Sequence, residues 1–211
     1  MNILFYLISV LVTFSVIGCA TPVIKSGTDF KKETLNNIVI GQTTKVEVIG
    51  VLGAPGGMRK RILNNAEYDI SIYAFSQLEE GLMNYKRLFC EFKNNLLNAY
   101  DFESTFKEDQ PRITEKEKIY LERGKTRRND VQNLFGTPTS KAFLPTTLIS
   151  DYVPSGTKEI WKYSHREIEM TIGRTTNIDK YLIKSIIIFF DGDGIVIDSS
   201  YFEDVSKGAT Y

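Results

Sequence analysis

The stretch GQTTKVEVIGVLGAP at residues 41–55 occurs a second time as GKTRRNDVQNLFGTP at residues 124–138. The two copies lie 83 residues apart, and Gly, Thr, Val, Gly and Pro keep the same offsets with no insertion between them. Agreement at five spaced positions is improbable by chance, and such internal repeats indicate a repeated structural unit. The repeat predicts that the chain is built twice from one small unit.

Each copy of the motif predicts a short helix of about ten residues. In the first copy, Thr43 or Thr44 is the expected N-cap, and Thr44 and Glu47 fit the capping-box pattern. In the second copy we expect Thr126 to be the N-cap. The apolar stripes are Val48, Val51 and Leu52 in one copy and Val131, Leu134 and Phe135 in the other. Gly53 with Pro55, and Gly136 with Pro138, end the helices. Residues 33–40 and 114–122 are expected to form a further helix or turn before each motif.

After each motif the apolar period changes from 3.6 to 2, which is typical of strands. The expected strands are residues 68–75, 87–92 and 96–100 in the first copy and 159–163, 186–190 and 195–197 in the second. Asp191-Gly192-Asp193-Gly194 is a strong hairpin signal. In this alignment Tyr73 corresponds to Trp161. The predicted fold class is α+β, with two tandem ααβββ modules whose helices pack on antiparallel three-stranded sheets. Module 1 spans 33–106, a linker 107–113, module 2 114–205 and a tail 206–211.

The N-terminus is expected to be an export signal. Residues 3–17 are apolar and uncharged, too short a run for a membrane-spanning helix of about 20 residues. Val16-Ile17-Gly18-Cys19 resembles the bacterial lipobox, which implies a signal peptide at 1–18 and a lipid on Cys19. Residues 19–32 would then be a lipidated tether, and Ala20, by the sorting rule of enteric bacteria, favours the outer membrane. The alternative is an uncleaved anchor with an incidental cysteine.

The order of motifs in the second copy resembles the BamE (SmpA/OmlA) family of outer-membrane lipoproteins. The residues that carry this resemblance are Gly124, Thr126, Gly136, Pro138, Trp161, Tyr163, Phe190, Asp191 and Gly194. A similar ααβββ unit occurs in tandem in secreted β-lactamase inhibitor proteins. The resemblance implies a lipid-anchored protein on the periplasmic face of the outer membrane. Its partner would be an envelope protein, and the barrel assembly complex is one candidate. It implies no catalytic site.

Composition excludes several other classes of function. Lys+Arg and Asp+Glu are equal at 26 each, so no global charge indicates nucleic-acid binding. One histidine is too few for a histidine-based metal site, and no cofactor is expected. Cys90 lies in an apolar strand and is expected to be a buried hydrophobe.

Three local patterns resemble chemical sites and are better explained by structure. Residues 191–194 supply too few oxygen donors for an EF-hand calcium loop, and a hairpin turn explains them. Ser164 and His165 are adjacent on a strand, so their side chains point to opposite faces, and we expect His165 at a strand end or surface. The Gly-rich residues 53–57 follow a helix and therefore place no helix N-terminus toward an anion. We therefore expect no enzymatic activity.

The residues expected to contact a partner are in the longest insertion, 140–158, and in a basic cluster. They are Phe143, Leu144, Leu148, Tyr152, Arg127 and Arg128. An apolar loop on a rigid scaffold is a natural recognition element, although this loop could equally fold over its own module. Arg59-Lys60-Arg61 and the cluster at 123–128 could face acidic lipid headgroups, a partner or solvent. The expected function is binding or scaffolding in the cell envelope through a sheet face or a groove between modules. The alternative is an inhibitor or ligand-binding protein.

Overall fold

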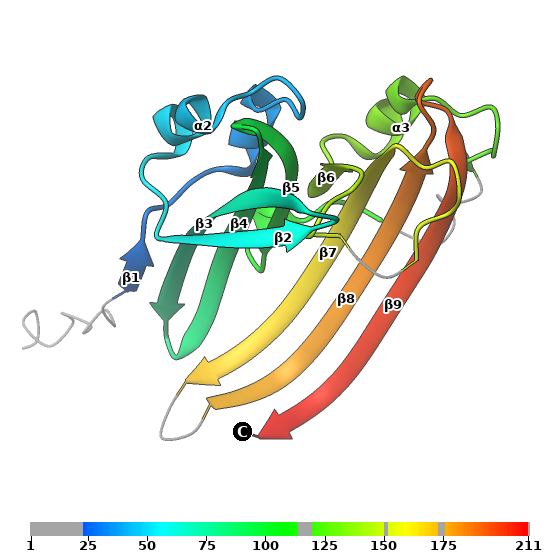
Figure 1. Ribbon diagram of the computed structural model, residues 1–211. Coiled ribbons are helices and arrows are strands. Elements are labelled where there is room, and N and C mark those ends of the chain that lie inside the picture. The colour runs from blue at the N-terminus through cyan, green and yellow to red at the C-terminus, as the bar shows by residue number, and fades with distance from the viewer. Residues whose placement is uncertain (1–22, 114–119, 150–151, 173–175, 211) are drawn as a thin grey trace, which may run out of the picture.

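The computed structural model describes residues 23–113, 120–149, 152–172 and 176–210. Within these residues the chain forms one antiparallel sheet with short helices on it (Figure 1). The strands are β1 Ile24–Gly27, β2 Gly57–Leu63, β3 Ala66–Glu79, β4 Leu82–Lys93, β5 Leu96–Ser104, β6 Ser140–Phe143, β7 Glu159–Ile172, β8 Thr176–Phe190 and β9 Val196–Thr210. The helices are α2 Lys45–Leu52 and α3 Arg128–Phe135, with the 3₁₀ helices η2 Lys32–Asn37 and η3 Lys107–Asp109.

The predicted fold class of two ααβββ modules is wrong. The sheet has nine strands in the order β1-β3-β4-β5-β6-β7-β8-β9, with β2 also paired to β3. Strand β6 joins the two halves because it pairs with β5 on one side and with β7 on the other. Two separate three-stranded sheets therefore do not form. The 3₁₀ helix η2 occupies most of the segment 33–40, as the predicted helix or turn. The second predicted segment, 114–122, lies mostly outside the described residues.

Strands β1, β2 and β6 are the three that the sequence did not predict. Strand β2 contains Arg59-Lys60-Arg61 and is exposed along most of its length, so it lacks the apolar alternation of a half-buried strand. It lies at a sheet edge, where charged residues are common. Strand β6 has only four residues, which is too short for a periodic signal. Near the N-terminus, β1 forms within the predicted tether and pairs with the end of β3.

The repeated motif makes the same backbone hydrogen bonds in both halves. The N–H of Gly41 donates to the carbonyl of Leu97 at 2.7 Å, and that of Gly124 donates to the carbonyl of Val196 at 2.8 Å. Both glycines have positive φ, at 77° and 76°, a conformation that glycine adopts without strain. Thr43 Oγ1 accepts the N–H of Val39 at 2.8 Å, and Thr126 Oγ1 accepts that of Glu122 at 2.8 Å. The motif therefore ties the turn before each helix to the sheet.

Helix α2 begins as predicted, whereas α3 begins one residue later than predicted. Thr44 is the N-cap of α2: its side chain accepts the N–H of Glu47, whose carboxylate accepts the N–H of Thr44 at 2.7 Å. The N-cap of α3 is Arg127 and not Thr126, because the hydroxyl of Thr126 is used in the preceding turn. Asp130 completes this start by accepting the N–H of Arg127 at 2.9 Å.

Both helices end at the predicted glycines and have eight residues each. Val48, Leu52 and Val131 are buried as predicted. Val51 and Leu134 are 47% and 41% exposed, so the stripe that contacts the sheet is narrower than predicted. Because each helix has only about two turns, one or two buried positions suffice to hold it on the sheet.

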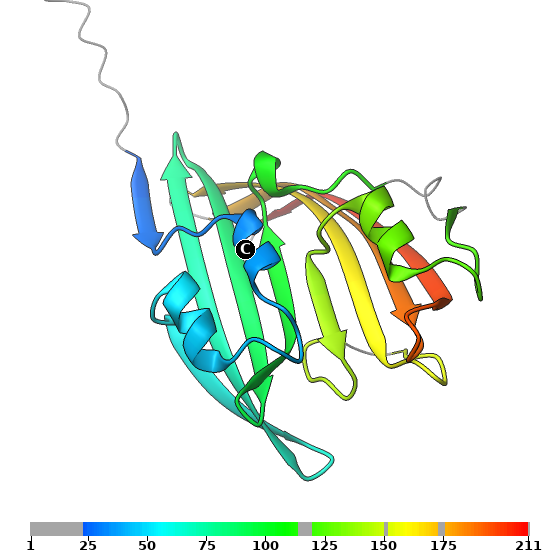
Figure 2. The same ribbon diagram turned by 90° about the horizontal axis from the view of Figure 1, so that it is seen from above.

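All the helices lie on one face of the sheet, which we call the outer face (Figure 2). Under η2 and α2, the core contains Phe30, Leu35, Ile38, Ile40, Val48, Leu52, Tyr73, Leu88, Cys90, Phe92, Leu97, Tyr100 and Phe102. Under α3, it contains Ile113, Leu121, Val131, Trp161, Tyr163, Ile186, Ile188, Phe190 and Val196. Cys90 is fully buried and free, which confirms the prediction for it.

Strand register corrects the predicted alignment of the two halves. In the first half Tyr73 pairs with Leu88, and in the second Tyr163 pairs with Ile186. When strand pairs are counted from the two residues that accept the hydrogen bonds of Gly41 and Gly124, Tyr73 corresponds to Tyr163, and Ser71 corresponds to Trp161. The predicted match of Tyr73 with Trp161 is wrong by two residues. A shift of two keeps every side chain on the same face, so alternation alone could not reveal the error.

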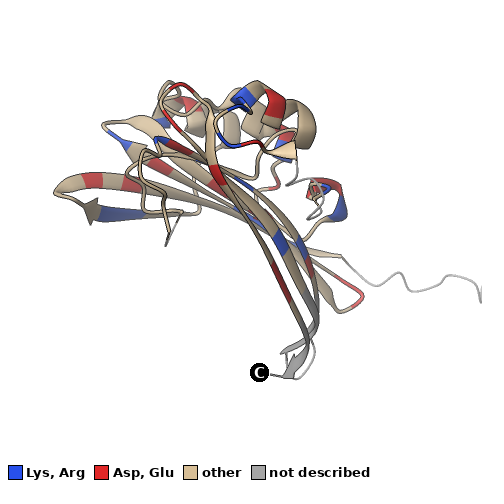
Figure 3. Cartoon of the chain, turned by 90° about the vertical axis from the view of Figure 1, so that its right-hand side faces the viewer, with Lys and Arg blue, Asp and Glu red and all other residues tan. Residues whose placement is uncertain are grey.

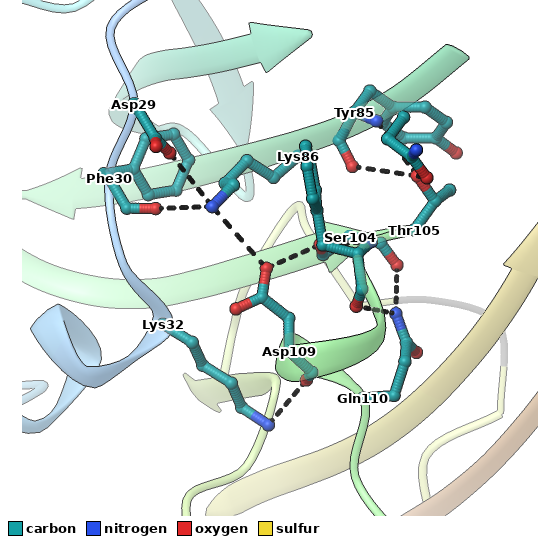
Figure 4. Close-up of polar contacts among 11 residues, drawn as sticks. Asp29, Phe30, Lys32, Tyr85, Lys86, Ser104, Thr105, Asp109 and Gln110 are labelled. Atoms are coloured by element: carbon teal, nitrogen blue, oxygen red, sulfur yellow. Dashed lines mark hydrogen bonds and ion pairs between the residues drawn. The ribbon is translucent and has the colours of Figure 1, made fainter. Parts of the chain in front are cut away.

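A buried polar cluster joins the N-terminal segment to the sheet on the outer face (Figure 4). Lys86 Nζ donates a hydrogen bond to the carbonyl of Phe30 at 3.0 Å and lies 3.0 Å from Asp29 Oδ1. It also lies 3.8 Å from Asp109 Oδ2, which accepts a hydrogen bond from Ser104 Oγ at 2.7 Å. Burial raises the pKa of Asp109. Because Lys86 meets both segments, it holds residues 29–30 and η3 against the same part of the sheet.

Candidate functional site

The sheet is curved, and the helices lie on the outside of its arc (Figure 3). Side chains alternate between the two faces of a strand. Because Tyr73, Leu88 and Cys90 belong to the helix-covered core, the residues between them point to the opposite, concave side, which we call the inner face. No helix among the described residues covers the inner face. This face is the first candidate site.

An aromatic and basic patch occupies the inner face on β3 and β4. Ile72 pairs with Phe89, and Ala74 pairs with Arg87, so these four residues are neighbours. The guanidinium of Arg87 lies 5.1 Å from the ring centroid of Tyr85, within the range of a cation–π contact. Aromatic residues and arginine are enriched in protein interfaces, and they supply many of the residues that dominate binding energy. We call these five residues, Ile72, Ala74, Tyr85, Arg87 and Phe89, the inner patch.

Two adjoining hollows flank the inner patch. The larger, of about 710 Å³, lies where β1 and β2 meet the edge of β3, and it is lined by Ala74, Tyr85 and Arg87 among others. The smaller, of about 180 Å³, is lined by Arg59, Arg61, Phe89 and Leu148 among others. Ile72 lines both hollows, so they adjoin on one surface. A surface with such relief can receive side chains of another protein.

Charged side chains form a ladder across the inner face where β5 meets β7. Glu103 lies between two arginines, 2.6 Å from Arg87 Nη2 and 2.8 Å from Arg166 Nη2. Lys162 Nζ lies 2.8 Å from Asp101 Oδ1. Because these pairs cross from β4 to β5 and from β5 to β7, they hold together the two halves of the sheet beyond the end of β6. The same charges border the inner patch.

Residues 144–149, which follow β6, fold over another part of the inner face. Leu144, Leu148 and Ile149 pack with Ala99, Ala142, Ile160 and Phe189 in a third apolar cluster. The buried carboxylate of Glu91 anchors the loop: it accepts hydrogen bonds from Thr146 Oγ1 at 2.9 Å and from the N–H of Thr147 at 2.7 Å. Thr147 Oγ1 also donates to Glu91. Residues 144–149 are therefore part of the scaffold.

The structure separates the residues predicted to contact a partner. Leu144 and Leu148 belong to the third cluster, and Phe143 packs against the first core. Tyr152 is 69% exposed. Arg127 and Arg128 are at the start of α3, where Arg128 Nε lies 2.6 Å from Glu159 Oε2. Arg128 and Phe143 both line the groove described next, but the six residues together do not form one surface. The predicted lipid site, Cys19, lies outside the described residues.

A groove on the outer face is the second candidate site. It has a volume of about 550 Å³ and lies between the first half and α3 of the second half. We call it the outer groove, and its lining residues are Leu35, Asn36, Ile38, Val39, Ile40, Gln42, Arg128, Gln132, Thr137, Lys141, Phe143, Glu159 and Trp161. Thr137 Oγ1 donates to Asn36 Oδ1 at 2.7 Å across it. Ligand sites are commonly concave, mostly apolar and of this size.

Lys141 is the distinctive group in the outer groove. Its ammonium lies 4.2 Å from the ring centroid of Trp161, in cation–π contact. Burial lowers the pKa of Lys141, while the charge of Glu159 raises it and that of Arg128 lowers it. The carboxylate of Glu159 is already bound by Arg128 and by Trp161 Nε1, the latter at 2.6 Å. Among the described residues, Lys141 has no carboxylate within ion-pair distance.

Two of the three patterns that resembled chemical sites, residues 191–194 and Ser164-His165, have structural partners. Asp191 Oδ1 accepts the N–H groups of Asp193 and Ile195, both at 2.9 Å, as expected of a hairpin turn. Ser164 accepts a hydrogen bond from Ser185 Oγ at 2.9 Å on one face. His165 contacts the carbonyl oxygen of Pro111 and the carboxylate of Glu167. It lies in the middle of β7 and not at a strand end, and its side chain is partly exposed. Among the described residues, no group of three or more His, Cys, Asp or Glu side chains could hold a metal ion.

The sequence did not single out the inner patch or the outer groove. Alternation in 87–92 predicted that Arg87 and Phe89 share a face, and this was the available signal for the inner patch. The outer groove needed the position of β6, because Lys141 meets Trp161 only through the pairing of β6 with β7. With β6 interpreted as a loop, Lys141 had no predicted neighbour.

Comparisons with known proteins return a fold neighbour and no family. No model of a protein family matches the chain, and no curated protein matches it. Among solved structures, the chain is similar to one from Streptococcus mutans described as a "putative beta-lactamase inhibitor protein", with 10% sequence identity and a TM-score of 0.45. The similarity covers 82% of this chain and 98% of that one. Membership of the BamE family is therefore not supported.

Within the part of the chain that the structure describes, none of the helices is long and apolar enough to cross a bilayer.

Proposed function

We propose that this chain is a non-enzymatic binding protein that holds a folded protein partner against the inner face of its sheet. The observation that carries the proposal is the inner patch, with Tyr85, Arg87 and Phe89 reachable from solvent beside two adjoining hollows. Helices pack on the outer face and leave this one uncovered. A sheet held by pairing along its whole width is a rigid support for such a surface.

The inner patch is preorganised for binding. Arg87 is fixed between Tyr85 and Glu103 before any partner arrives, so little side-chain freedom remains to be lost on binding. The curvature of the inner face fits a convex partner surface. Further along the same face, on β9, Phe202 is 53% exposed, which extends the apolar contact area to the opposite edge.

Anchoring at a membrane is the second part of the proposal. The lipobox-like sequence ending at Cys19 precedes β1 by only a few residues, so a lipid there would place the sheet close to the membrane surface. Several acyl chains would hold a soluble domain firmly, at about 0.8 kcal/mol per buried CH₂. Cys19→Ala should abolish metabolic labelling with a fatty acid, and labelling that persists in the variant would rule out Cys19.

Photo-crosslinking in intact cells tests the proposed surface and identifies the partner. A photoreactive phenylalanine analogue is placed at Tyr85, at Phe202 or at Val46, which is exposed on α2 of the outer face. We expect the same protein to crosslink from Tyr85 and Phe202 and not from Val46. Crosslinking from Val46 alone would overturn the proposed surface.

The identity of the captured protein separates two versions of the proposal. An outer-membrane barrel assembly protein would support a role as a scaffold component of the cell envelope. A soluble enzyme whose activity falls on addition of this chain would support the inhibitor version. Both versions use the same inner face.

A further inference from the structure

The two halves of the chain can be compared position by position around their helices. The same backbone hydrogen bonds hold both motifs, and one ion pair also recurs: Lys45 with Asp69 at 2.9 Å, and Arg128 with Glu159 at 2.6 Å. These shared features explain the architecture. Any function specific to one half must come from positions where the halves differ.

Four such differences converge on the outer groove. Lys141 and Trp161 pair across β6 and β7, where Met58 and Ser71 pair across β2 and β3. Gln132 of α3 stands where α2 has Ile49. Phe143 stands where β2 has Lys60. All four second-half residues line the outer groove.

The stability of the fold does not explain why the groove contains the ammonium group of Lys141. A buried or half-buried lysine is costly unless its charge is balanced. Lys141 is half-buried against Trp161, and the nearest acid, Glu159, is already occupied by Arg128 and by the indole N–H. Methionine at the equivalent position of the first half serves the same pairing without a charge.

The rest of the lining describes the complementary ligand. Leu35, Ile38 and Ile40 present an apolar wall from the first half. Amide side chains of Asn36, Gln42 and Gln132 line the groove as well. Arg128, Lys141 and Glu159 together carry one net positive charge, so the groove is complementary to one negative charge next to an apolar body.

From this geometry we propose that the outer groove binds a peptide segment in which one acidic side chain lies between apolar residues. The carboxylate accepts a hydrogen bond from Lys141 Nζ above the Trp161 ring, and an apolar neighbour packs against Ile38 and Ile40. The amide groups bind the peptide backbone. This site is on the face opposite the inner patch, so it is independent of the proposed function.

Trp161 is a built-in reporter for the test because it is the only tryptophan of the chain. The full mature chain is titrated with N-acetyl-Leu-Asp-Leu-amide and with N-acetyl-Leu-Asn-Leu-amide, which differ only in the carboxylate, while tryptophan emission is recorded. We expect the aspartate peptide to bind at least about tenfold more tightly, since hydrogen bonds between charged groups are stronger than neutral ones.

Three variants assign the effect to Lys141. Lys141→Met, which installs the residue found at the equivalent position of the first half, should reduce the preference for aspartate to within about twofold. Lys141→Arg should retain it. Lys125→Met removes an exposed lysine that is paired with Glu122 outside the groove, and it should behave as wild type. Circular dichroism and thermal melting confirm that each variant is folded.

Several results would overturn the proposal. One is equal affinity for both peptides, and another is an aspartate preference that survives in folded Lys141→Met. A third is no saturable change in emission up to about 10 mM peptide, where even very weak binding is detectable. Hexanoate binding as tightly as the aspartate peptide would also overturn it, because the peptide body would then contribute nothing. Failure of this site would leave crosslinking at the inner face unaffected.

Discussion

The surroundings of α2 and α3 share a backbone frame and differ in what lies under it. In both, a glycine with positive φ and a threonine hydroxyl fix the turn that precedes the helix. Beneath α3 the sheet presents Trp161, whereas the equivalent residue beneath α2 is Ser71. Ser71 is fully buried, and its hydroxyl has no hydrogen-bond partner among the residues that the structure describes. The motif therefore specifies the backbone frame, while the strand residues under each helix can change independently.

The largest effect on stability is expected from substituting the two equivalent residues that differ beneath the helices, Trp161 and Ser71. Trp161→Ser should destabilise the protein by about 3–5 kcal/mol, because it leaves a large cavity and removes the indole N–H from Glu159. Ser71→Ala should change stability by less than about 1 kcal/mol, since it removes a buried hydroxyl that has no partner. Urea unfolding followed by circular dichroism measures both. Equal effects would contradict the difference between the two sites.

A smaller contrast is expected for the recurring ion pair. Arg128→Met should cost about 2 kcal/mol, because it leaves the buried Glu159 carboxylate with only the Trp161 N–H. Lys45→Met should cost about 0.5 kcal/mol or less, since Lys45 and Asp69 are both partly exposed. Unfolding in low and high salt separates the two, and salt should screen mainly the Lys45 pair. A larger loss from Lys45→Met would show that burial does not set the difference.

The two equivalent tyrosines give the smallest contrast at neutral pH. Tyr163 Oη donates a hydrogen bond to the carbonyl of Gly136 at 3.0 Å, whereas the hydroxyl of Tyr73 is buried with no partner in the described part of the chain. Tyr163→Phe should therefore cost about 1 kcal/mol, and Tyr73→Phe should be neutral or slightly stabilising. Thermal melting of the two variants is the measurement. Destabilisation by Tyr73→Phe alone would reverse the assignment.

At alkaline pH, Tyr73 and Tyr163 should both lower the stability of the folded protein. Burial raises the pKa of Tyr73 to about 12 and also raises the pKa of Tyr163. Unfolded tyrosine loses its proton near its usual pKa of about 10, while the folded protein retains it. Stability should therefore be complete below pH 10 and fall as pH rises from about 10 toward 12. Denaturant midpoints at pH 8 and 11 test this, and Tyr73→Phe should reduce the fall. Unchanged midpoints would contradict the burial of these hydroxyls.

The sequence predicted local structure well and the arrangement of strands poorly. Alternation located β3, β4, β7 and β8, and the capping pattern located α2, because these signals arise from neighbours in the chain. The single sheet depended on β6, whose four residues pair with β5 and β7 and show no period of their own. The outer groove followed from this long-range pairing, whereas the residues of the inner patch meet in the β3–β4 hairpin. The six predicted contact residues did not converge on one surface.

The central claim, that a protein partner binds the inner face, is tested most directly by affinity. Binding of the protein recovered by crosslinking is measured by surface plasmon resonance for wild type and for Tyr85→Ala, Arg87→Ala and Val46→Ala. We expect each inner-face change to weaken binding by about 30-fold, as for interface residues that contribute about 2 kcal/mol. Val46→Ala should leave affinity unchanged. Full affinity in both inner-face variants, with a loss in Val46→Ala, would contradict the claim.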